Sequence, residues 1–152
     1  MNQTVTPPEQ RQPMTLIERF FKLRDVPPFD RLYDSELSLI TEATVQRFYE
    51  PGHVILSSNK LLKALFIVVD GWLEDGEGRR LPQVFSPEYL LMGIPADGDM
   101  TASKERGAIC LLISKGHFFT MLYECPVLTL GFSELHHGPE DQTDPKMPAV
   151  MT

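Results

Sequence analysis

The chain has 152 residues, 42% of them hydrophobic, and 21 acidic residues against 14 Lys and Arg give it a formal net charge of −7. This length suits one globular domain that can bury a core without disulfides or a metal. The acidic balance argues against a nucleic-acid partner, because contact with phosphates requires a basic face.

The cysteine content and the hydropathy of the chain indicate its cellular compartment. Cys110 and Cys125 are too few for a disulfide framework, and Cys110 lies in an apolar stretch typical of a buried small side chain. Residues 1–13 contain no apolar segment like that of a signal peptide. No run approaches the roughly 18 apolar residues of a membrane span. We therefore expect a cytoplasmic protein without a membrane partner.

The composition divides the chain into one domain and two tails. Residues 1–14 contain prolines and glutamines but little to bury, which predicts a disordered tail. Residues 136–152 are polar and contain prolines, which predicts a second one. The folded domain is expected over residues 15–135.

Two short helices are predicted at the start of the domain. Thr15 and Glu18 have the spacing of a capping box, and the sequence at 25–28 ends this helix with two prolines. A second helix is expected over residues 35–43, with Asp34 as its N-cap. The apolar side chains expected to face inward are Leu16, Ile17, Phe20, Phe21 and Leu23 on the first helix and Leu37, Leu39 and Ile40 on the second.

Short apolar runs separated by Gly-centred turns follow, and they predict antiparallel strands in a meander, barrel or sandwich. The most apolar run is 65–73, where Leu-Phe-Ile-Val-Val stops at Asp70-Gly71 and resumes with Trp72; it predicts a strand buried on both faces. Other strands are expected over residues 45–49, 54–57, 81–85 and 108–113. Turns or loops are expected over residues 50–53, 58–64, 75–78, 93–99 and 101–107.

Helical patterns return after these strands. Ser86, Pro87 and Glu88 read as N-cap, first-turn proline and first-turn acid of a short helix over 87–92. Ser114 is predicted to cap a helix ending near Glu124, and a further short helix is expected over 126–135. Most aromatic residues are assigned to the core, and a minority on the terminal helices could form an exposed patch for a partner.

Two motifs within this pattern resemble the cyclic nucleotide-binding domain family. Residues 48–55, Phe-Tyr-Glu-Pro-Gly-His-Val-Ile, are similar to the aromatic-x-x-Gly-x-x-Ile turn of that family. Residues 65–73, Leu-Phe-Ile-Val-Val-Asp-Gly-Trp-Leu, are similar to its Leu-Tyr-Ile-Val-x-x-Gly-x-Val strand pair. The resemblance covers about residues 16–135. It implies a mainly β fold with flanking helices: an antiparallel β-roll, or jelly roll, between short N-terminal helices and C-terminal helices.

The resemblance also places the family's phosphate-binding cassette, without gaps, on residues 85–102. The cassette glycine falls on Ser86, the glutamate that would hold the ribose falls on Pro87, and the arginine that would pair with the cyclic phosphate falls on Ala96. Asp97 and Asp99 stand beside that position. The pocket positions implied by the resemblance are Phe85, Ser86, Pro87, Glu88, Leu90, Leu91, Ala96 and Asp97.

These substitutions predict a degenerate pocket. Removing one partner of a buried charge pair costs about 2–5 kcal/mol, or roughly thirtyfold to several-thousandfold in affinity. Glu88 would also occupy the positive end of the short helix that an anion could otherwise use. Residual cAMP binding through backbone amides alone is expected to be weak.

The sequence gives little support for a metal site or a catalytic site. His53 stands alone in a turn, whereas a metal site of the cupin type needs paired histidines, and His136-His137 is better explained as part of a solvated tail. The sequence has no nucleophile elbow, zincin, phosphate-loop or dinucleotide motif. We expect neither an enzyme nor a cofactor.

Two functional hypotheses remain open. The first is a regulatory or adaptor module, monomeric or weakly dimeric, that contacts an unidentified protein partner through its flanking helices and cassette loop. The second is a sensor that binds a small molecule, a cyclic nucleotide or another ligand, in the β-roll pocket. A pocket filled by Tyr89, Leu91 or Met92 would favour the first hypothesis, and a hollow pocket would favour the second.

Overall fold

The computed structural model describes residues 12–85 and 87–136, and the side chains of 135 and 136 are not described. Both predicted tails therefore lie almost entirely outside the described residues, as does Ser86. The elements are α1 (Leu16–Arg24), η2 (Phe29–Arg31), α2 (Asp34–Ala43), β1 (Val45–Tyr49), β2 (Val54–Leu56), β3 (Ala64–Gly71), β4 (Leu73–Glu74), β5 (Val84–Phe85), α3 (Pro87–Met92), β6 (Met100–Ala102), β7 (Ala108–Ser114), α4 (Lys115–Glu124) and α5 (Val127–His136).

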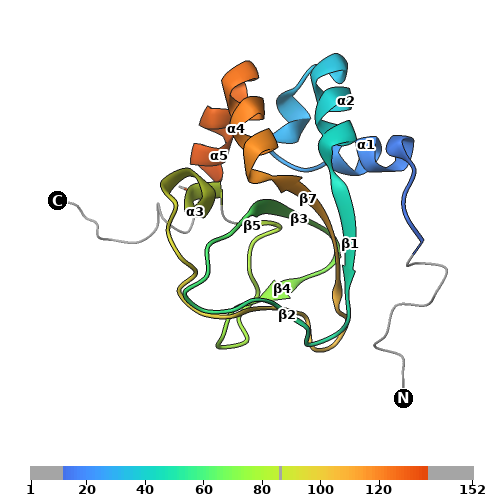
Figure 1. Cartoon of the computed structure of the whole chain (residues 1–152). Coiled ribbons are helices and arrows are strands. Elements are labelled where there is room, and N and C mark those ends of the chain that lie inside the picture. Colours follow the sequence, from blue (N-terminus) through green and yellow to red (C-terminus); the bar gives the residue numbers. More distant parts are fainter. Residues whose placement is uncertain (1–11, 86, 137–152) are drawn as a thin grey trace.

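The strands form two antiparallel sheets that close into a roll. One sheet has the order β1-β7-β3-β5 and the other has the order β2-β6-β4. Helices α1, α2, α4 and α5 gather at one end of the roll, and α3 lies beside it (Figure 1). The predicted mainly β architecture with flanking helices is confirmed. Among the described residues, no helix is long and apolar enough to cross a bilayer.

The pairing of β3 with β7 forms the centre of the core. Its register runs from Ala64 opposite Ser114 to Gly71 opposite Ala108, with an irregularity between Val68 and Asp70. Leu65 and Ile67 are fully buried, which confirms the expected burial for the first half of the strand. Cys110, opposite Val68, is a free buried thiol, and desolvation raises its pKa to about 12. It is a small uncharged core residue, as predicted.

The sequence analysis missed β6. Residues 101–107 were expected to form a turn, but Met100–Ala102 pairs with β2 on one side and with β4 on the other. Three residues are too few to show the alternation that identifies a strand, and this one depends on its two neighbours for its hydrogen bonds. The strand expected over 81–85 is shorter than predicted, because only Val84–Phe85 pairs with β3.

The first helix begins as predicted but packs differently. The Thr15 hydroxyl accepts a hydrogen bond from the Glu18 amide at 3.1 Å, and the Glu18 carboxylate accepts from the Thr15 amide at 2.9 Å, which is the expected capping box. The expected inward face is wrong in part: Leu23 is buried, whereas Ile17 and Phe21 are 66% and 61% exposed. Helix α1 therefore leaves part of its apolar face uncovered.

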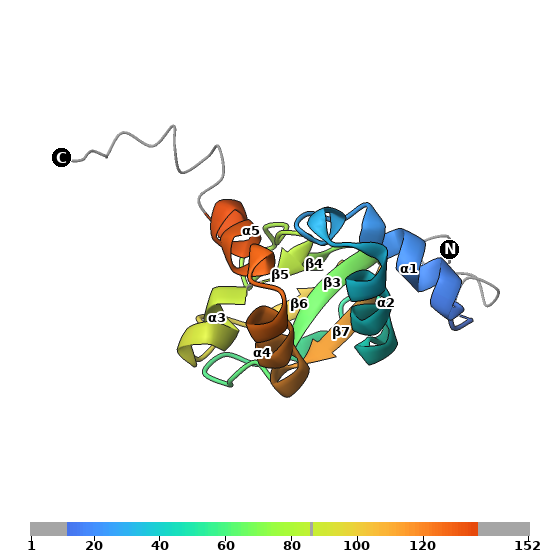
Figure 2. The ribbon, with the colours of Figure 1, turned by 90° about the horizontal axis from the view of Figure 1, so that it is seen from above.

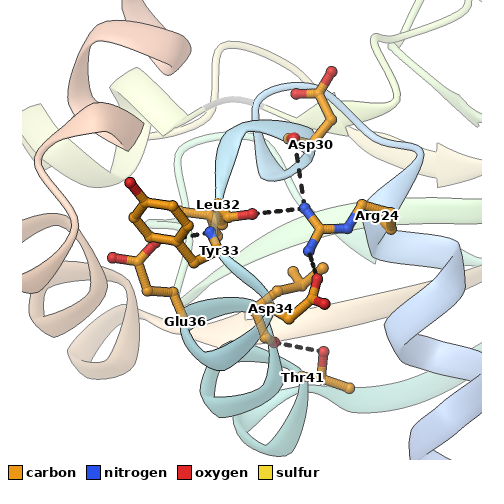
Figure 3. A network of polar contacts seen from close by, with 8 residues as sticks. Arg24, Asp30, Leu32, Tyr33, Asp34, Glu36 and Thr41 are labelled. Atoms are coloured by element: carbon orange, nitrogen blue, oxygen red, sulfur yellow. Dashed lines mark hydrogen bonds and ion pairs between the residues drawn. The ribbon is translucent and has the colours of Figure 1, made fainter.

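The start of α2 is held by Arg24 from the end of α1 (Figure 3). The Arg24 guanidinium donates to the Leu32 carbonyl at 2.7 Å and pairs with the Asp34 carboxylate. The prediction of Asp34 as the N-cap is wrong, because Asp34 is the first residue of the helix. The N-cap is Tyr33, whose amide donates to the Glu36 carboxylate at 3.0 Å. Leu37 and Ile40 are buried as expected, but Leu39, predicted to face inward, is 66% exposed.

The C-terminal helices close the core with aromatic contacts. The Ser114 hydroxyl accepts a hydrogen bond from the His117 amide at 3.3 Å and caps α4, as predicted. Helix α5 begins at Val127, one residue after the predicted start. The ring of Phe132 on α5 lies 5.9 Å from that of Phe29 and 5.7 Å from that of Phe118. These contacts join α4, α5 and η2.

A substitution at Gly71 tests how closely the C-terminal end of β3 approaches the backbone just before β7. It has φ of +71°, and a Cβ atom placed there would lie 2.1 Å from the carbonyl oxygen of Gly107. We expect Gly71→Ala to lower the free energy of unfolding by at least about 3 kcal/mol, since backbone overlap adds to a left-handed strain of about 1–3 kcal/mol.

Gly52 provides the matched control, because it has φ of +79° and a Cβ atom placed there would meet nothing within 4 Å. Gly52→Ala should lower the free energy of unfolding by only about 1–2 kcal/mol, the left-handed strain alone. Urea unfolding of both variants makes the measurement. Equal losses of stability would contradict the close approach of Gly71 to Gly107.

Candidate ligand cavity and cassette loop

A cavity of about 300 Å³ opens between the hairpin after β4, the region around α3, and the loop before β6. We call it the β-roll cavity. This volume is at the lower end of the range of small-molecule sites. Its walls are formed by Leu56, Asp75, Gly76, Glu77, Arg79, Leu81, Phe85, Tyr89, Ala96, Asp97, Gly98, Asp99 and Met100.

The apolar side chains of the wall do not fill the cavity. The rings of Phe85 and Tyr89 meet edge to face with centroids 5.9 Å apart, and Tyr89 lines the space without closing it. Leu91 and Met92 are 45% and 70% exposed and are not part of the wall. None of the three side chains that could have filled the pocket does so.

The polar wall is strongly acidic. Among the described lining residues, Asp75, Glu77, Asp97 and Asp99 place four carboxylates on the cavity against the guanidinium of Arg79. That guanidinium is already paired, with Asp75 at 2.9 Å and with Glu77 at 3.1 Å. An anion entering the cavity therefore meets an excess of negative charge and no uncommitted cation among these lining residues.

The hairpin after β4 stabilises the charged form of the Asp75 carboxylate. One carboxylate oxygen accepts hydrogen bonds from the backbone amides of Glu77 and Arg79, both at 2.9 Å. The amide of Arg79 is the main cause of the lowered pKa of Asp75, with smaller contributions from the Glu77 amide and the Arg79 side chain. The negative charge on this wall is thus built into the turn.

The cassette loop is held against the loop after β2. The Ala96 amide donates to the Lys60 carbonyl at 2.8 Å, and the Ala96 carbonyl accepts from the Asn59 amide at 2.9 Å. The Asp99 carboxylate accepts from the Ser58 amide at 2.8 Å. Across the cavity, the pKa of Tyr89 is raised by desolvation first and then by the charges of Asp97 and Glu88.

The predicted pocket positions fall into two groups. Phe85, Ala96 and Asp97 line the β-roll cavity. The remaining described positions lie on α3 and do not form part of its wall: Pro87 and Leu90 are buried, Glu88 is half-buried and Leu91 is exposed. Ser86 lies outside the described residues. The helical turn of α3 directs these neighbours to different sides, which is why a run of adjacent residues cannot all reach one cavity.

Sequence reasoning missed the hairpin residues Asp75, Glu77 and Arg79. Their Asp-Gly-x-Gly pattern was recognised as a turn, but nothing local indicates what lies opposite that turn. The sheet order β2-β6-β4 brings it against the loop before β6. Only the pairing of β6 with β4 makes the two acidic segments neighbours.

No metal centre is formed in the part of the chain that the structure describes, since no three His, Cys, Asp or Glu side chains gather suitably there. His53 is exposed in its turn, with its ring 5.6 Å from that of Tyr49. Of the His136-His137 pair, His137 lies outside the described residues.

Comparison with solved structures identifies the fold. The sensor domain of the transcriptional regulator DNR from Pseudomonas aeruginosa has a TM-score of 0.64 at 12% identity, and the match covers 90% of this chain and 98% of that one. The catabolite activator protein of Thermus thermophilus has a TM-score of 0.64 at 18% identity, covering 78% and 60%. The regulatory subunit of a cAMP-independent protein kinase A from Trypanosoma cruzi, bound to guanosine, has a TM-score of 0.63 at 19% identity, covering 83% and 49%.

These matches show that the chain has the β-roll fold of cyclic nucleotide-binding domains, as the two sequence motifs predicted. The chain spans about half the length of the kinase regulatory subunit, 49%. It matches no protein-family model and no curated protein sequence.

The Asp75 turn yields a pH-dependent prediction. In Arg79→Gln, the pKa of Asp75 should rise towards its ordinary value but stay below it, because the backbone amides of residues 77 and 79 still bind the carboxylate. A carboxyl with a lowered pKa stabilises the fold above its unfolded pKa and loses that contribution as the pH falls. The fall of stability with acid should therefore begin at only a slightly higher pH, because solvent screens this exposed ion pair.

NMR titration of the Asp75 carboxyl carbon measures this shift. Arg80→Gln is the matched control, because the Arg80 guanidinium lies over the Trp72 ring, 4.2 Å from its centroid, and does not contribute to the lowered pKa of Asp75. Complete return of the Asp75 pKa to its ordinary value in Arg79→Gln would show that the side chain, and not the turn, fixes the charge.

Proposed function

We propose that this domain is a non-enzymatic regulatory module whose β-roll cavity admits a small non-anionic molecule and excludes cAMP and cGMP in their usual mode. Whether the cavity is occupied or empty is then communicated to a partner protein through contacts of the flanking helices. The observation that carries this proposal is a hollow cavity whose described wall has four carboxylates and one committed guanidinium.

The argument against a cyclic nucleotide rests on charge. Ala96 stands where the resemblance places the phosphate-binding arginine, and Asp97 and Asp99 line the cavity beside it. Loss of the buried partner of a charge costs about 2–5 kcal/mol, and the carboxylates of Asp97 and Asp99 add repulsion of a phosphate. The cavity nevertheless keeps aromatic and aliphatic surface in Phe85, Tyr89 and Leu81, which suits an uncharged ring.

The guanosine bound by the Trypanosoma cruzi subunit supports the choice of ligand class. A nucleoside offers a flat ring and hydroxyl groups but no phosphate. Carboxylates such as Asp97 and Asp99 can accept hydrogen bonds from sugar hydroxyls. An uncharged nucleoside therefore avoids the repulsion that a cyclic phosphate meets in this cavity.

An adaptor that needs no ligand is the second candidate, and exposed apolar side chains favour it. Phe119 and Tyr123 on α4 and Leu130 on α5 are 41%, 87% and 62% exposed. Aromatic and aliphatic side chains presented in this way are common at protein interfaces. In either case the helices supply the contact with a partner protein.

A thermal-shift and calorimetry series on the purified full chain tests the proposal. The compounds are cAMP, cGMP, adenosine and guanosine at about 1 mM each, which is a hundredfold excess over a Kd of about 10 μM. We expect a nucleoside to raise the unfolding temperature and the cyclic nucleotides not to do so; a ligand at a hundred times its Kd stabilises a fold by about 2.7 kcal/mol. A clear shift with cAMP or cGMP would overturn the proposal. No shift with any compound would favour the ligand-independent adaptor.

A gain of function tests the assignment of the cassette. Ala96→Arg should create measurable cAMP affinity, at least about thirtyfold above that of the unmodified chain, because it places a charge partner for the phosphate in the cavity wall. Ala96→Gln adds a polar side chain without the charge and should gain nothing. An intact Ala96→Arg variant that does not bind cAMP in calorimetry would show that the cassette is placed incorrectly.

A further inference from the structure

One side of the β-roll cavity carries negative charge that no described cation neutralises. Asp97 and Asp99, on the loop before β6, line the cavity, and both are exposed. Neither forms an ion pair with a lysine or arginine of the described residues. The Lys60 carbonyl accepts a hydrogen bond from the Ala96 amide of this loop, but Lys60 is not part of the cavity wall. The loop side of the cavity therefore has two carboxylates without a counter-charge.

The two arginines of the hairpin after β4 have other partners. Arg79, on the opposite side of the cavity, is paired with Asp75 at 2.9 Å and with Glu77 at 3.1 Å. Arg80, the next residue, lies over the Trp72 ring, 4.2 Å from its centroid, and lines a separate hollow along β3. A cation that enters the β-roll cavity therefore meets more negative than positive charge on the described wall.

Aromatic rings lie close to the acidic loop. Phe85 and Tyr89 line the cavity, and their rings meet edge to face with centroids 5.9 Å apart. The pKa of Tyr89 is raised by desolvation first and next by the charge of Asp97, so this carboxylate lies within electrostatic range of the Tyr89 hydroxyl. Aromatic rings and carboxylates both attract an ammonium group, the rings through the negative charge of their faces.

The same wall does not suit a metal ion. No three His, Cys, Asp or Glu side chains gather as metal ligands do within the described part of the chain. The carboxylates are also engaged with the backbone: Asp75 accepts from the amides of Glu77 and Arg79, and Asp99 accepts from the Ser58 amide. A hollow of about 300 Å³ has room instead for an organic molecule.

We propose that the ligand of the β-roll cavity is an organic cation, a small molecule that joins a protonated amine to an aromatic ring system. This inference rests on the proposed function, because it names the charge of the molecule that the cavity admits. The ammonium group lies beside Asp97, and the ring lies against Phe85 and Tyr89. Because Asp97 is exposed, the amine keeps part of its hydration when it binds, which limits the cost of desolvation.

Two nucleosides of nearly the same shape test the charge of the ligand. 5′-Amino-5′-deoxyadenosine carries a protonated amine at neutral pH where adenosine has a hydroxyl group. In calorimetry on the full chain, the amine should bind about threefold to thirtyfold more tightly than adenosine, the combined effect of one exposed ion pair and one cation–π contact. A rise from about 0.1 M to 1 M salt should weaken binding of the amine and leave that of adenosine unchanged, because salt screens exposed charges.

Asp97→Asn tests the place of the ammonium group. This variant keeps the size of the side chain, so it should weaken binding of the amine by up to about fivefold and leave binding of adenosine unchanged. The control, Glu42→Gln, removes the same charge from an exposed position on α2, which lies across the molecule from α3 in both views (Figures 1 and 2). It should change neither affinity. Binding of the amine that survives Asp97→Asn, or that falls equally in the control, would overturn the inference.

The outcomes also separate this inference from the proposed function. If adenosine and its amine bind with equal affinity, the cavity admits a nucleoside as proposed, but its ligand is not selected for positive charge and the inference is wrong. If neither compound binds, the inference fails together with the ligand-binding function. Tighter binding of the amine that is lost at high salt and reduced in Asp97→Asn would support both.

Discussion

The antiparallel pairing of β3 with β7 is the constraint on which the other parts of the domain depend. It buries Leu65 and Ile67 completely, and it continues as far as Gly71, opposite Ala108. There the backbone of Gly107 comes so close that no side chain fits on Gly71. The chain can then leave the first sheet and enter the second at β4, which carries the hairpin of Asp75 to the cavity. The position of the cavity wall is thus fixed by a backbone contact at a distance from it.

The same scaffold presents hollows of opposite sign. In the β-roll cavity, the hydrogen bonds of the turn stabilise the charged form of Asp75, and Arg79, a cation of the described wall, is paired with Asp75 and Glu77. In the two hollows along β3, which Lys22, Arg80 and Arg106 line together with Asp70, the surplus of charge is positive. A fold associated with the binding of a phosphate inside its roll has here placed carboxylates inside and basic groups outside. The fold therefore constrains the location of a site much more than its chemistry.

Local features of the sequence predicted local features of the structure. The capping residues Thr15 and Ser114 act on amides three residues away, so short spacing was sufficient to recognise them. The burial of Leu65–Val68 followed from hydrophobicity alone. The exposure of Phe21 and Leu39 was not predictable, because helical periodicity identifies an apolar face but not whether another element covers it. Strand β6 and the acidic hairpin opposite it depend on the order of strands in a sheet, which no short stretch of sequence contains.

Leu81 lies in the wall of the β-roll cavity and also in the wall of the hollow beside Trp72 and Arg80. The two hollows therefore share a wall residue, and a movement of the Leu81 side chain would change the shape of both. Occupants on the two sides of Leu81 would be thermodynamically linked: whatever free energy one adds to or removes from the binding of the other, the other returns in equal measure.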